Sequence, residues 1–132
     1  ILDQLSTLRS AGYTLCIATS KAHSYARKIT VHFGIADYMS FEFGSELDGT
    51  RSDKTSLLAH GLKTVGAKAD CTVMVGDRKY DAVGAKANGM KVLGVTYGYG
   101  SVAELTKAGV DDIILSPMDL SEVVSKILPL KD

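Results

Sequence analysis

The sequence predicts an α/β protein in three layers, with a parallel sheet covered by helices on both faces. Two observations support this fold class. Short apolar runs of about five residues alternate along the chain with segments of helical periodicity. The runs are apolar throughout rather than alternately apolar and polar, as expected for strands buried on both faces. The length of 132 residues suits a single domain of this kind.

The chain opens with helical spacing. Three leucines recur at intervals of three, which predicts that residues 1–10 form part of a helix: Leu2, Leu5 and Leu8. No capping residue precedes them, so the sequence indicates that it opens inside something longer. We expect residues 1–11 to be the tail of a preceding cap or linker helix. We expect residues 1–132 to form one core domain, apart from that tail.

The first strands and helices follow this opening. Residues 13–18, with the sequence YTLCIA, are an apolar, β-rich run and are predicted to form a strand. Residues 22–33 are predicted to form a helix that ends at a glycine. A second strand is predicted over residues 38–43. Residues 53–65 are predicted to form a helix, because their leucines line one face and Gly66 follows.

The second half of the chain repeats this alternation. The predicted elements, in order, are strand 71–75, helix 80–88, strand 91–95, helix 102–108, strand 112–115 and helix 120–128. Each strand is a short apolar run, and a glycine follows each of the first two helices. Asp119, after Pro117, is the expected N-cap of the last helix.

Composition limits the classes of partner and the compartment. Fifteen basic residues balance fifteen acidic ones, so net charge gives no argument for a nucleic acid polymer or an anionic membrane. No apolar run reaches the roughly 18 residues of a membrane span. The two cysteines, Cys16 and Cys71, adjoin apolar runs without a CxxC pair. We expect both to be buried free thiols in a reducing compartment, which favours the cytoplasm.

Polar residues follow the first predicted strand. In doubly wound parallel sheets, ligands bind at the carboxyl ends of the strands. Thr19 and Ser20 follow the first strand and precede a predicted helix, where two hydroxyls and a helix N-terminus suit an oxyanion. The alternative is that Ser20 simply caps the helix.

Two carboxylates and a lysine occupy similar positions further along. Asp77 follows the third strand directly, and Asp81 comes one helical turn later, so both can approach one Mg²⁺ ion. The alternative is that both are helix caps. Lys54 stands at a predicted helix start, where a cation is unfavourable unless an anion needs it. A solvated surface lysine is the alternative.

Taken together and in this order, the motifs resemble those of haloacid dehalogenase-type phosphatases. The segment CIATSK resembles motif II around Thr19, Lys54 resembles the motif III lysine, and VMVGDRKYDAVGAKANGM resembles motif IV with Asp77 and Asp81. The strings FGSELDGTRSDK and GVTYGYGSVAEL resemble the phosphoglycolate phosphatase-like branch. The resemblance covers essentially the whole chain.

The resemblance implies a Rossmann-like sheet and a reaction. Thr19, Ser20 and Lys54 would hold the phosphoryl group of a small phosphorylated metabolite, and Asp77 and Asp81 would bind Mg²⁺. In the family, an aspartate of motif I attacks the phosphate monoester and forms an aspartyl-phosphate. Motif I lies on an N-terminal strand, central in the sheet, and a cap domain follows it. Both are missing from this sequence, so the resemblance implies a nucleophile outside the chain and an inactive chain alone.

Two other motifs suggest alternatives. Residues 46–50, ELDGT, mimic motif I, but Glu46 is too long and Lys54 follows too closely. Residues 98–103 fit the GxGxxA dinucleotide fingerprint, yet an acid is absent from the carboxyl end of the next strand. A non-catalytic phosphate-binding remnant and, less favoured, a dinucleotide-binding domain therefore remain as alternatives. The sequence gives no indication of substrate identity or oligomeric state.

Overall fold

The structure, a computed structural model, describes residues 2–22, 35–45, 53–96 and 101–129. The helices are α1 (Leu2–Ala11), α3 (Lys54–Val65), α4 (Lys79–Ala87), α5 (Val102–Lys107) and α6 (Leu120–Ile127). The strands are β1 (Cys16–Ala22), β2 (Phe41–Ser45), β3 (Val73–Gly76), β4 (Lys91–Val95) and β5 (Asp112–Ile114). Three short 3₁₀ turns cover Ile35–Tyr38, Ala69–Cys71 and Pro117–Asp119.

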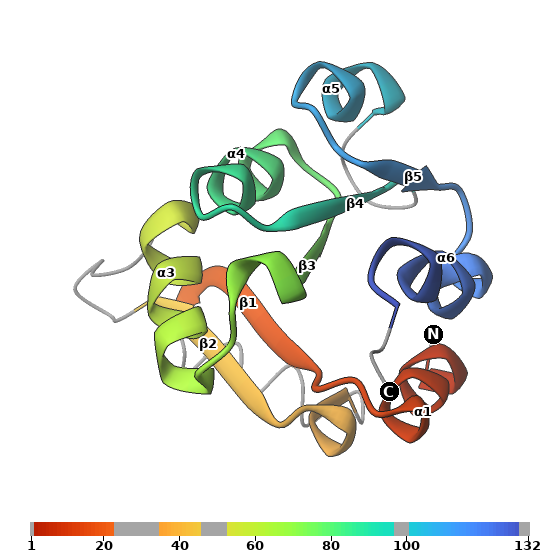
Figure 1. The fold of residues 1–132 in the computed structure, drawn as a ribbon. Coiled ribbons are helices and arrows are strands. Elements are labelled where there is room, and N and C mark those ends of the chain that lie inside the picture. The colour runs from red at the N-terminus through yellow and green to blue at the C-terminus, as the bar shows by residue number, and fades with distance from the viewer. Residues whose placement is uncertain (1, 23–34, 46–52, 97–100, 130–132) are drawn as a thin grey trace.

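The strands form two parallel sheets in the described part of the chain. β1 pairs with β2, while β3, β4 and β5 pair in that order. Helices α3 and α4 lie on one side of the strands and α1 and α6 on the other (Figure 1). This arrangement confirms the predicted α/β class with helices on both faces. In the described residues no strand joins the β1–β2 pair to the sheet of β3, β4 and β5, and the resemblance implied that a central strand is missing.

Strand β4 carries the core on both of its faces. Leu93 and Val95 pack with α1 and α6, and Val92 on the opposite face packs with α4. The first cluster contains Leu8, Leu93, Val95, Ile114, Leu120 and Val124. The second contains Leu58, Ala82, Ala85, Met90 and Val92. Apolar burial on both faces explains why this strand is apolar without alternation.

The N-terminal segment, α1 and Tyr13 just after it, forms hydrogen bonds near both ends of α6. The Gln4 side-chain oxygen accepts hydrogen bonds from the backbone N–H (2.9 Å) and the hydroxyl (2.8 Å) of Ser121, in the first turn of α6. The Tyr13 hydroxyl donates to the carbonyl of Leu128, just beyond the end of α6, at 2.6 Å. Leu8 is buried between them. Residues 2–11 thus pack into the same core as α6, and their origin in a preceding cap or linker remains a prediction.

Several predicted boundaries were wrong. The first strand begins at Cys16 rather than at residue 13 and runs to Ala22, so it includes Thr19 and Ser20. Residues 35–38 form a 3₁₀ turn, and the second strand therefore begins only at Phe41. The third strand likewise follows a 3₁₀ turn that ends at Cys71. Apart from Ala22, the predicted helix over residues 22–33 lies outside the described residues.

Predicted helix ends fared better. Gly66 ends α3 in the left-handed region, with φ of 74°, and its N–H bonds the carbonyl of Leu62. Asp119 precedes α6 as predicted, but its side chain makes no capping hydrogen bond. Ser116 instead caps the preceding 3₁₀ turn by accepting from the N–H of Met118.

The cysteine prediction was half right. Both thiols are free, but Cys16 and Cys71 are exposed rather than buried. Cys16 starts β1, and Cys71 ends the turn before β3, so neither reaches the interior of a sheet. Burial around the sulfur nonetheless raises the pKa of the Cys16 thiol, against a smaller lowering by the hydrogen bond with the backbone of Phe41. In the parts of the chain that the structure describes, no helix is long and apolar enough to cross a membrane.

Candidate functional site

A cavity of about 340 Å³ opens between the two sheets. Residues at or near the carboxyl ends of β1, β3 and β4 line it, together with the first turns of α3 and α4. The lining residues are Ala18, Thr19, Lys54, Met74, Val75, Gly76, Asp77, Asp81 and Val95. Four of the five predicted site residues are therefore brought together. The fifth, Ser20, lies in β1, and its side chain is outside the described part of the structure.

Lys54 is the first residue of α3 and points into this cavity. Its Nζ donates to Oδ1 of Asp81 at 3.0 Å and to the carbonyl of Ala18 at 3.0 Å. The side chains of Lys54 and Asp81 are each only 11% exposed. Lys54 is therefore not the solvated surface lysine of the alternative interpretation. Its burial beside a carboxylate explains a cation at an otherwise unfavourable helix start.

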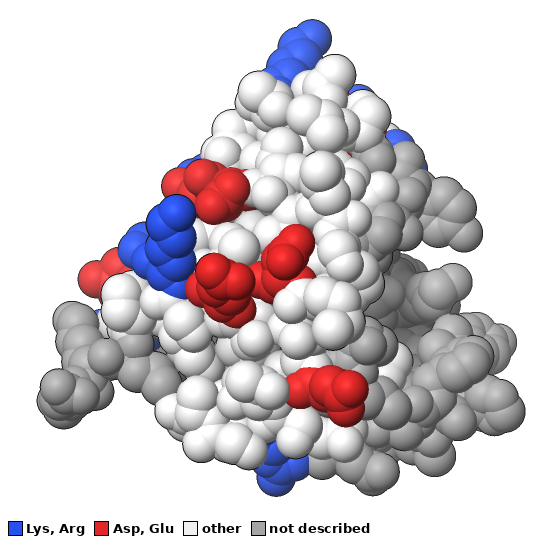
Figure 2. Space-filling model, turned by 90° about the vertical axis from the view of Figure 1, so that its right-hand side faces the viewer, with Lys and Arg blue, Asp and Glu red and all other residues white. Residues whose placement is uncertain are grey.

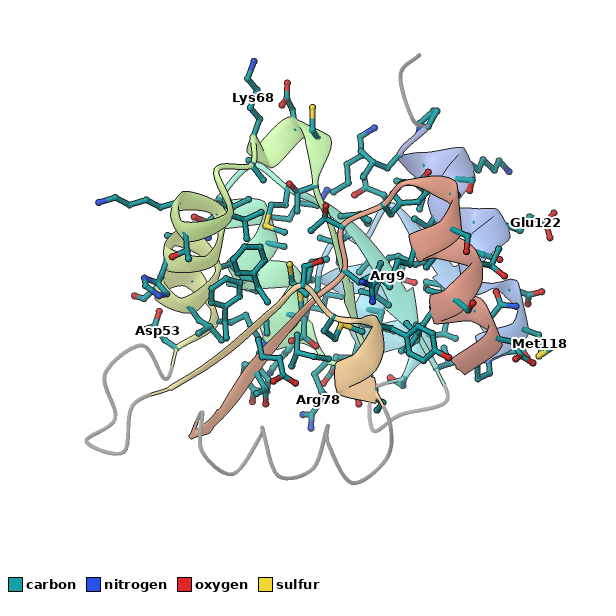
Figure 3. All side chains as sticks on the ribbon, turned by 90° about the horizontal axis from the view of Figure 1, so that it is seen from below. Arg9, Asp53, Lys68, Arg78, Met118 and Glu122 are labelled. Atoms are coloured by element: carbon teal, nitrogen blue, oxygen red, sulfur yellow. The ribbon has the colours of Figure 1, made fainter. Side chains whose placement is uncertain are left out.

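The N-terminus of α3 is capped by the residue before Lys54. Asp53, labelled in Figure 3 at the start of α3, accepts a hydrogen bond from the N–H of Ser56 at 2.9 Å. This hydrogen bond lowers the pKa of the Asp53 carboxyl. Because Asp53 supplies the negative charge that a helix start favours, Lys54 is left available to pair with Asp81.

Asp81 is held in place by contacts with Arg78, Gly76 and Lys54. Asp81 is 8% exposed, and its Oδ2 accepts a hydrogen bond from the backbone N–H of Arg78 at 3.3 Å, as in a helix-capping box. A Cβ at Gly76 would overlap the Asp81 carboxyl group, so only glycine fits there. The capping interpretation of Asp81 is therefore correct, but it is incomplete because the same carboxylate pairs with Lys54.

Close contact between α3 and α4 sets the position of Lys54. A Cβ built at Gly84 would lie 2.8 Å from Cβ and Cγ of Lys54 and 2.9 Å from its backbone carbonyl carbon. The two helices can cross at this distance only because residue 84 has no side chain. Gly84 thus brings the α3 start, and with it the lysine ammonium, next to the start of α4.

Asp77 and Asp81 are the two carboxylates of the cavity that could hold Mg²⁺. Asp77 is half-buried in the turn between β3 and α4 and lines the same cavity. Hard carboxylate oxygens suit Mg²⁺, which often takes one or two carboxylates plus waters and phosphate oxygens. Both Asp81 oxygens accept hydrogen bonds, from Lys54 and from the N–H of Arg78. The described residues hold no group of three metal-binding side chains. The donor set fits Mg²⁺ on these terms.

Thr19 lies in a different local structure from the one predicted. It is half-buried in β1, where pairing with β2 is irregular between Ala18 and Ala22. The helix expected after Thr19 does not begin at Ala22, which is the last residue of β1, and the rest of that predicted helix lies outside the described residues. Thr19 thus lines the cavity from an irregular part of β1.

An ion pair at the rim of the site was not predicted. Glu104 in α5 accepts from Nε of Arg78 at 3.1 Å, and Arg78 directly follows Asp77. Hydrogen bonding and charge from Glu104 raise the pKa of the Arg78 guanidinium. The signal in the sequence was limited to Arg78 directly after Asp77, because Glu104 comes nine residues after the end of β4.

Three relatives share substantial sequence with the chain. A 5'-nucleotidase of Pseudomonas aeruginosa is 44% identical over 105 residues, which are 80% of this chain and 48% of the relative. The tyrosine-protein kinase PtkA of Mycobacterium tuberculosis is 44% identical over 96 residues, or 73% and 33% of the two chains. A phosphoglycolate phosphatase of Neisseria meningitidis is 32% identical over 130 residues, or 97% and 54%. The chain thus spans about half or less of their lengths.

The fold has a close counterpart among solved structures. A predicted phosphatase from Clostridium acetobutylicum matches with a TM-score of 0.93 and 37% identity, over 96% of this chain and 58% of that one. The family model of haloacid dehalogenase-like hydrolases matches residues 1–95, which include both predicted metal ligands and Lys54. The resemblance in the sequence motifs is therefore confirmed: this chain belongs to the haloacid dehalogenase-like hydrolases.

Proposed function

We propose that the polypeptide containing this chain is a magnesium-dependent phosphatase of small phosphate monoesters, such as phosphoglycolate or a nucleotide. One observation carries the proposal. The Lys54 ammonium is held by Asp81 and the Ala18 carbonyl in a cavity that Thr19 and Asp77 also line. A buried cation, a hydroxyl and two carboxylates around one space suit a phosphate and its metal. The nucleotidase and phosphoglycolate phosphatase among the relatives support this substrate class.

Each residue has a distinct proposed role. Lys54, Thr19 and Ser20 would bind phosphoryl oxygens, and Lys54 would stabilise the charge that spreads over them in the transition state. Asp77 would hold Mg²⁺ directly, while Asp81 would do so through water and keep Lys54 in position. The ion, when bound, supplies positive charge next to the phosphoryl oxygens.

The nucleophile is proposed to be an aspartate outside this chain. Its carboxylate would attack phosphorus, the ester oxygen would leave as an alcohol after protonation, and water would hydrolyse the aspartyl-phosphate to free phosphate. The position of the cavity between β1 and β3 supports this, because a strand from elsewhere would deliver a carboxylate there.

The experiment measures p-nitrophenyl phosphate hydrolysis by the longest natural polypeptide that contains these residues, with Mg²⁺ and then with EDTA. Lys54→Ala is expected to lower kcat at least 100-fold, as for other electrostatic groups at reacting centres. Asp77→Asn is expected to weaken Mg²⁺ activation at least tenfold. Lys126→Ala and Asp70→Asn are matched controls, because both residues are exposed and lie outside the cavity lining. Metal-independent turnover, or an unchanged Lys54→Ala rate, would refute the proposal.

The 132-residue chain tested alone separates the alternatives. We expect no turnover. Metal-dependent turnover would place the nucleophile within the chain, at Glu46 or Asp48, both outside the described residues. Tight binding of phosphate compounds by the longer polypeptide, without turnover, would favour the non-catalytic remnant, and protection by NAD(P) against heating would favour the dinucleotide-binding domain. Phosphate transfer from ATP to a tyrosine peptide would instead match the relative named as a tyrosine kinase.

The proposed partners are small metabolites rather than polymers. Figure 2 shows one face of the protein on which red acidic side chains are scattered over a largely white surface. The described residues on this face form no broad basic patch of the kind that binds nucleic acid. We further propose a cytoplasmic location, which the two free cysteines support.

A further inference from the structure

The carboxylate of Glu104 joins α5 to the turn that carries Asp77. It accepts hydrogen bonds from Nε (3.1 Å) and Nη2 (3.5 Å) of Arg78, and from the backbone N–H of Lys79 (3.2 Å). Lys79 is the first residue of α4, so its N–H has no acceptor within its own helix. Glu104 therefore caps α4 from another helix, 25 residues further along the chain.

Glu104 is itself firmly placed. Its N–H donates to the hydroxyl of Ser101, the N-cap of α5. The next residue, Leu105, is 1% exposed and packs against β4, where a Cβ at Gly94 would lie 3.0 Å from Leu105 Cδ1. These contacts hold the backbone at Glu104. The position of Glu104 is thus fixed by β4, independently of the turn that it contacts.

The turn from Asp77 to Asp81 is held from two sides. Asp81 accepts from the N–H of Arg78 on the cavity side, and Glu104 binds the Arg78 side chain on the outer side. The side chains of Arg78 and Glu104 are 40% and 23% exposed, so solvent only partly screens their attraction. The Arg78 charge also interacts with Asp77. The guanidinium is thus hydrogen-bonded to Glu104 and lies within electrostatic range of Asp77.

We propose that Glu104 is a positioning residue for the metal site: it caps α4 and holds Arg78 away from the Asp77 carboxylate. This rests on the proposed magnesium role of Asp77. Without Glu104, Arg78 is released to pair with Asp77 and competes with the metal for it. The loss would then come mainly from the freed arginine, and removing that arginine should reverse much of it.

The test measures Mg²⁺ affinity by isothermal titration calorimetry, and kcat in parallel, on the longest natural polypeptide. Glu104→Gln is expected to weaken Mg²⁺ binding about tenfold, as for other residues that orient metal ligands. The amide can still accept from the N–H of Lys79, so the change mainly removes the charge that holds Arg78. Adding Arg78→Ala to this variant is expected to restore affinity to within about threefold of the parent.

Glu122→Ala is the matched control. Glu122 is also an acidic residue in the first turn of a helix, but it is exposed on α6 and points away from the body of the protein at the right of Figure 3, whereas Arg78 lies at the lower edge. Its Mg²⁺ affinity should equal that of the parent.

Two results would overturn the inference while the proposed function stands: unchanged affinity in Glu104→Gln, or failure of Arg78→Ala to restore it. A parent that neither binds Mg²⁺ nor turns over would overturn both proposals together. Equal melting temperatures of the variants without metal would show that affinity, rather than folding, had changed.

Discussion

Removing one charge of the buried Lys54–Asp81 pair should destabilise the protein strongly, because the other charge is then left buried without its partner. At 3.0 Å and an effective dielectric constant of about 20, the attraction between two unit charges is about 5.5 kcal/mol. Desolvation offsets part of this, and breaking a buried pair from one side typically costs about 3–5 kcal/mol. We therefore expect Asp81→Asn and Lys54→Met each to lower the free energy of unfolding by about 3 kcal/mol or more.

A double-mutant cycle measures the coupling between the two charges. The double variant should lose at least about 2 kcal/mol less than the two single losses together, because neither charge is then left unpaired. The hydrogen bond from Lys54 to Ala18 is absent from both the Lys54→Met variant and the double variant, so it cancels in the cycle.

Urea unfolding without Mg²⁺, at about 0.1 and 1 M NaCl, gives the four free energies. The coupling should change little with salt, because both side chains are shielded from water. A coupling below about 0.5 kcal/mol, or one that vanishes at high salt, would refute the reasoning.

Three further predictions concern packing, pH and a hydrogen bond. Gly84→Ala should destabilise the protein by about 1–3 kcal/mol in urea unfolding and lower kcat, because the new methyl group would displace Lys54; a neutral effect would show that the helices can separate freely. Partial burial favours a raised pKa at Asp111, but a hydrogen bond from a β4 amide and nearby ammonium groups outweigh it and lower the pKa below the ordinary 3.8. The carboxylate therefore stabilises the fold above about pH 4 and loses this effect as pH falls through the lowered pKa. Asp111→Asn should accordingly be less stable than the parent at pH 7 and approach the parent's stability in strong acid. A constant difference in stability across that range would contradict this. Tyr13→Phe should cost about 1 kcal/mol in thermal unfolding through loss of the bond to Leu128, and an unchanged melting temperature would count against that bond in solution.

Much of the fold could be predicted from the sequence because β4 and its neighbours are apolar runs, which are recognisable as buried strands. The limits of β4, residues 91–95, were predicted to the residue. Errors fell where polar residues continue a strand. β1 extends through Thr19 and Lys21, which lack the apolar pattern, because the strand pairs with β2 again at Ala22 after an irregular stretch. Such pairing depends on residues more than 20 positions away and leaves no local signal.

The sequence predicted which residues line the site better than it predicted how they pair with one another. Spacing alone placed Asp77 and Asp81 at one strand end, and the structure puts both on one cavity with Lys54. The pairing of Asp81 with Lys54 could not be read from the sequence, because it depends on a helix crossing that Gly84 permits. The contact of Glu104 with Arg78 likewise depends on how α5 packs on β4.

The joining of α1 to α6 has a consequence for the order of folding. Gln4 and Ser121 are 117 positions apart, so their contact closes a loop whose entropy cost is about 4 kcal/mol. Helices α1 and α6, the first and last of the described helices, lie side by side as a result (Figure 1). During synthesis, α1 emerges first among the described elements and must wait for α6 before Leu8 is covered. Until then it leaves an apolar face open, and that interval is when a nascent chain would most need protection from aggregation.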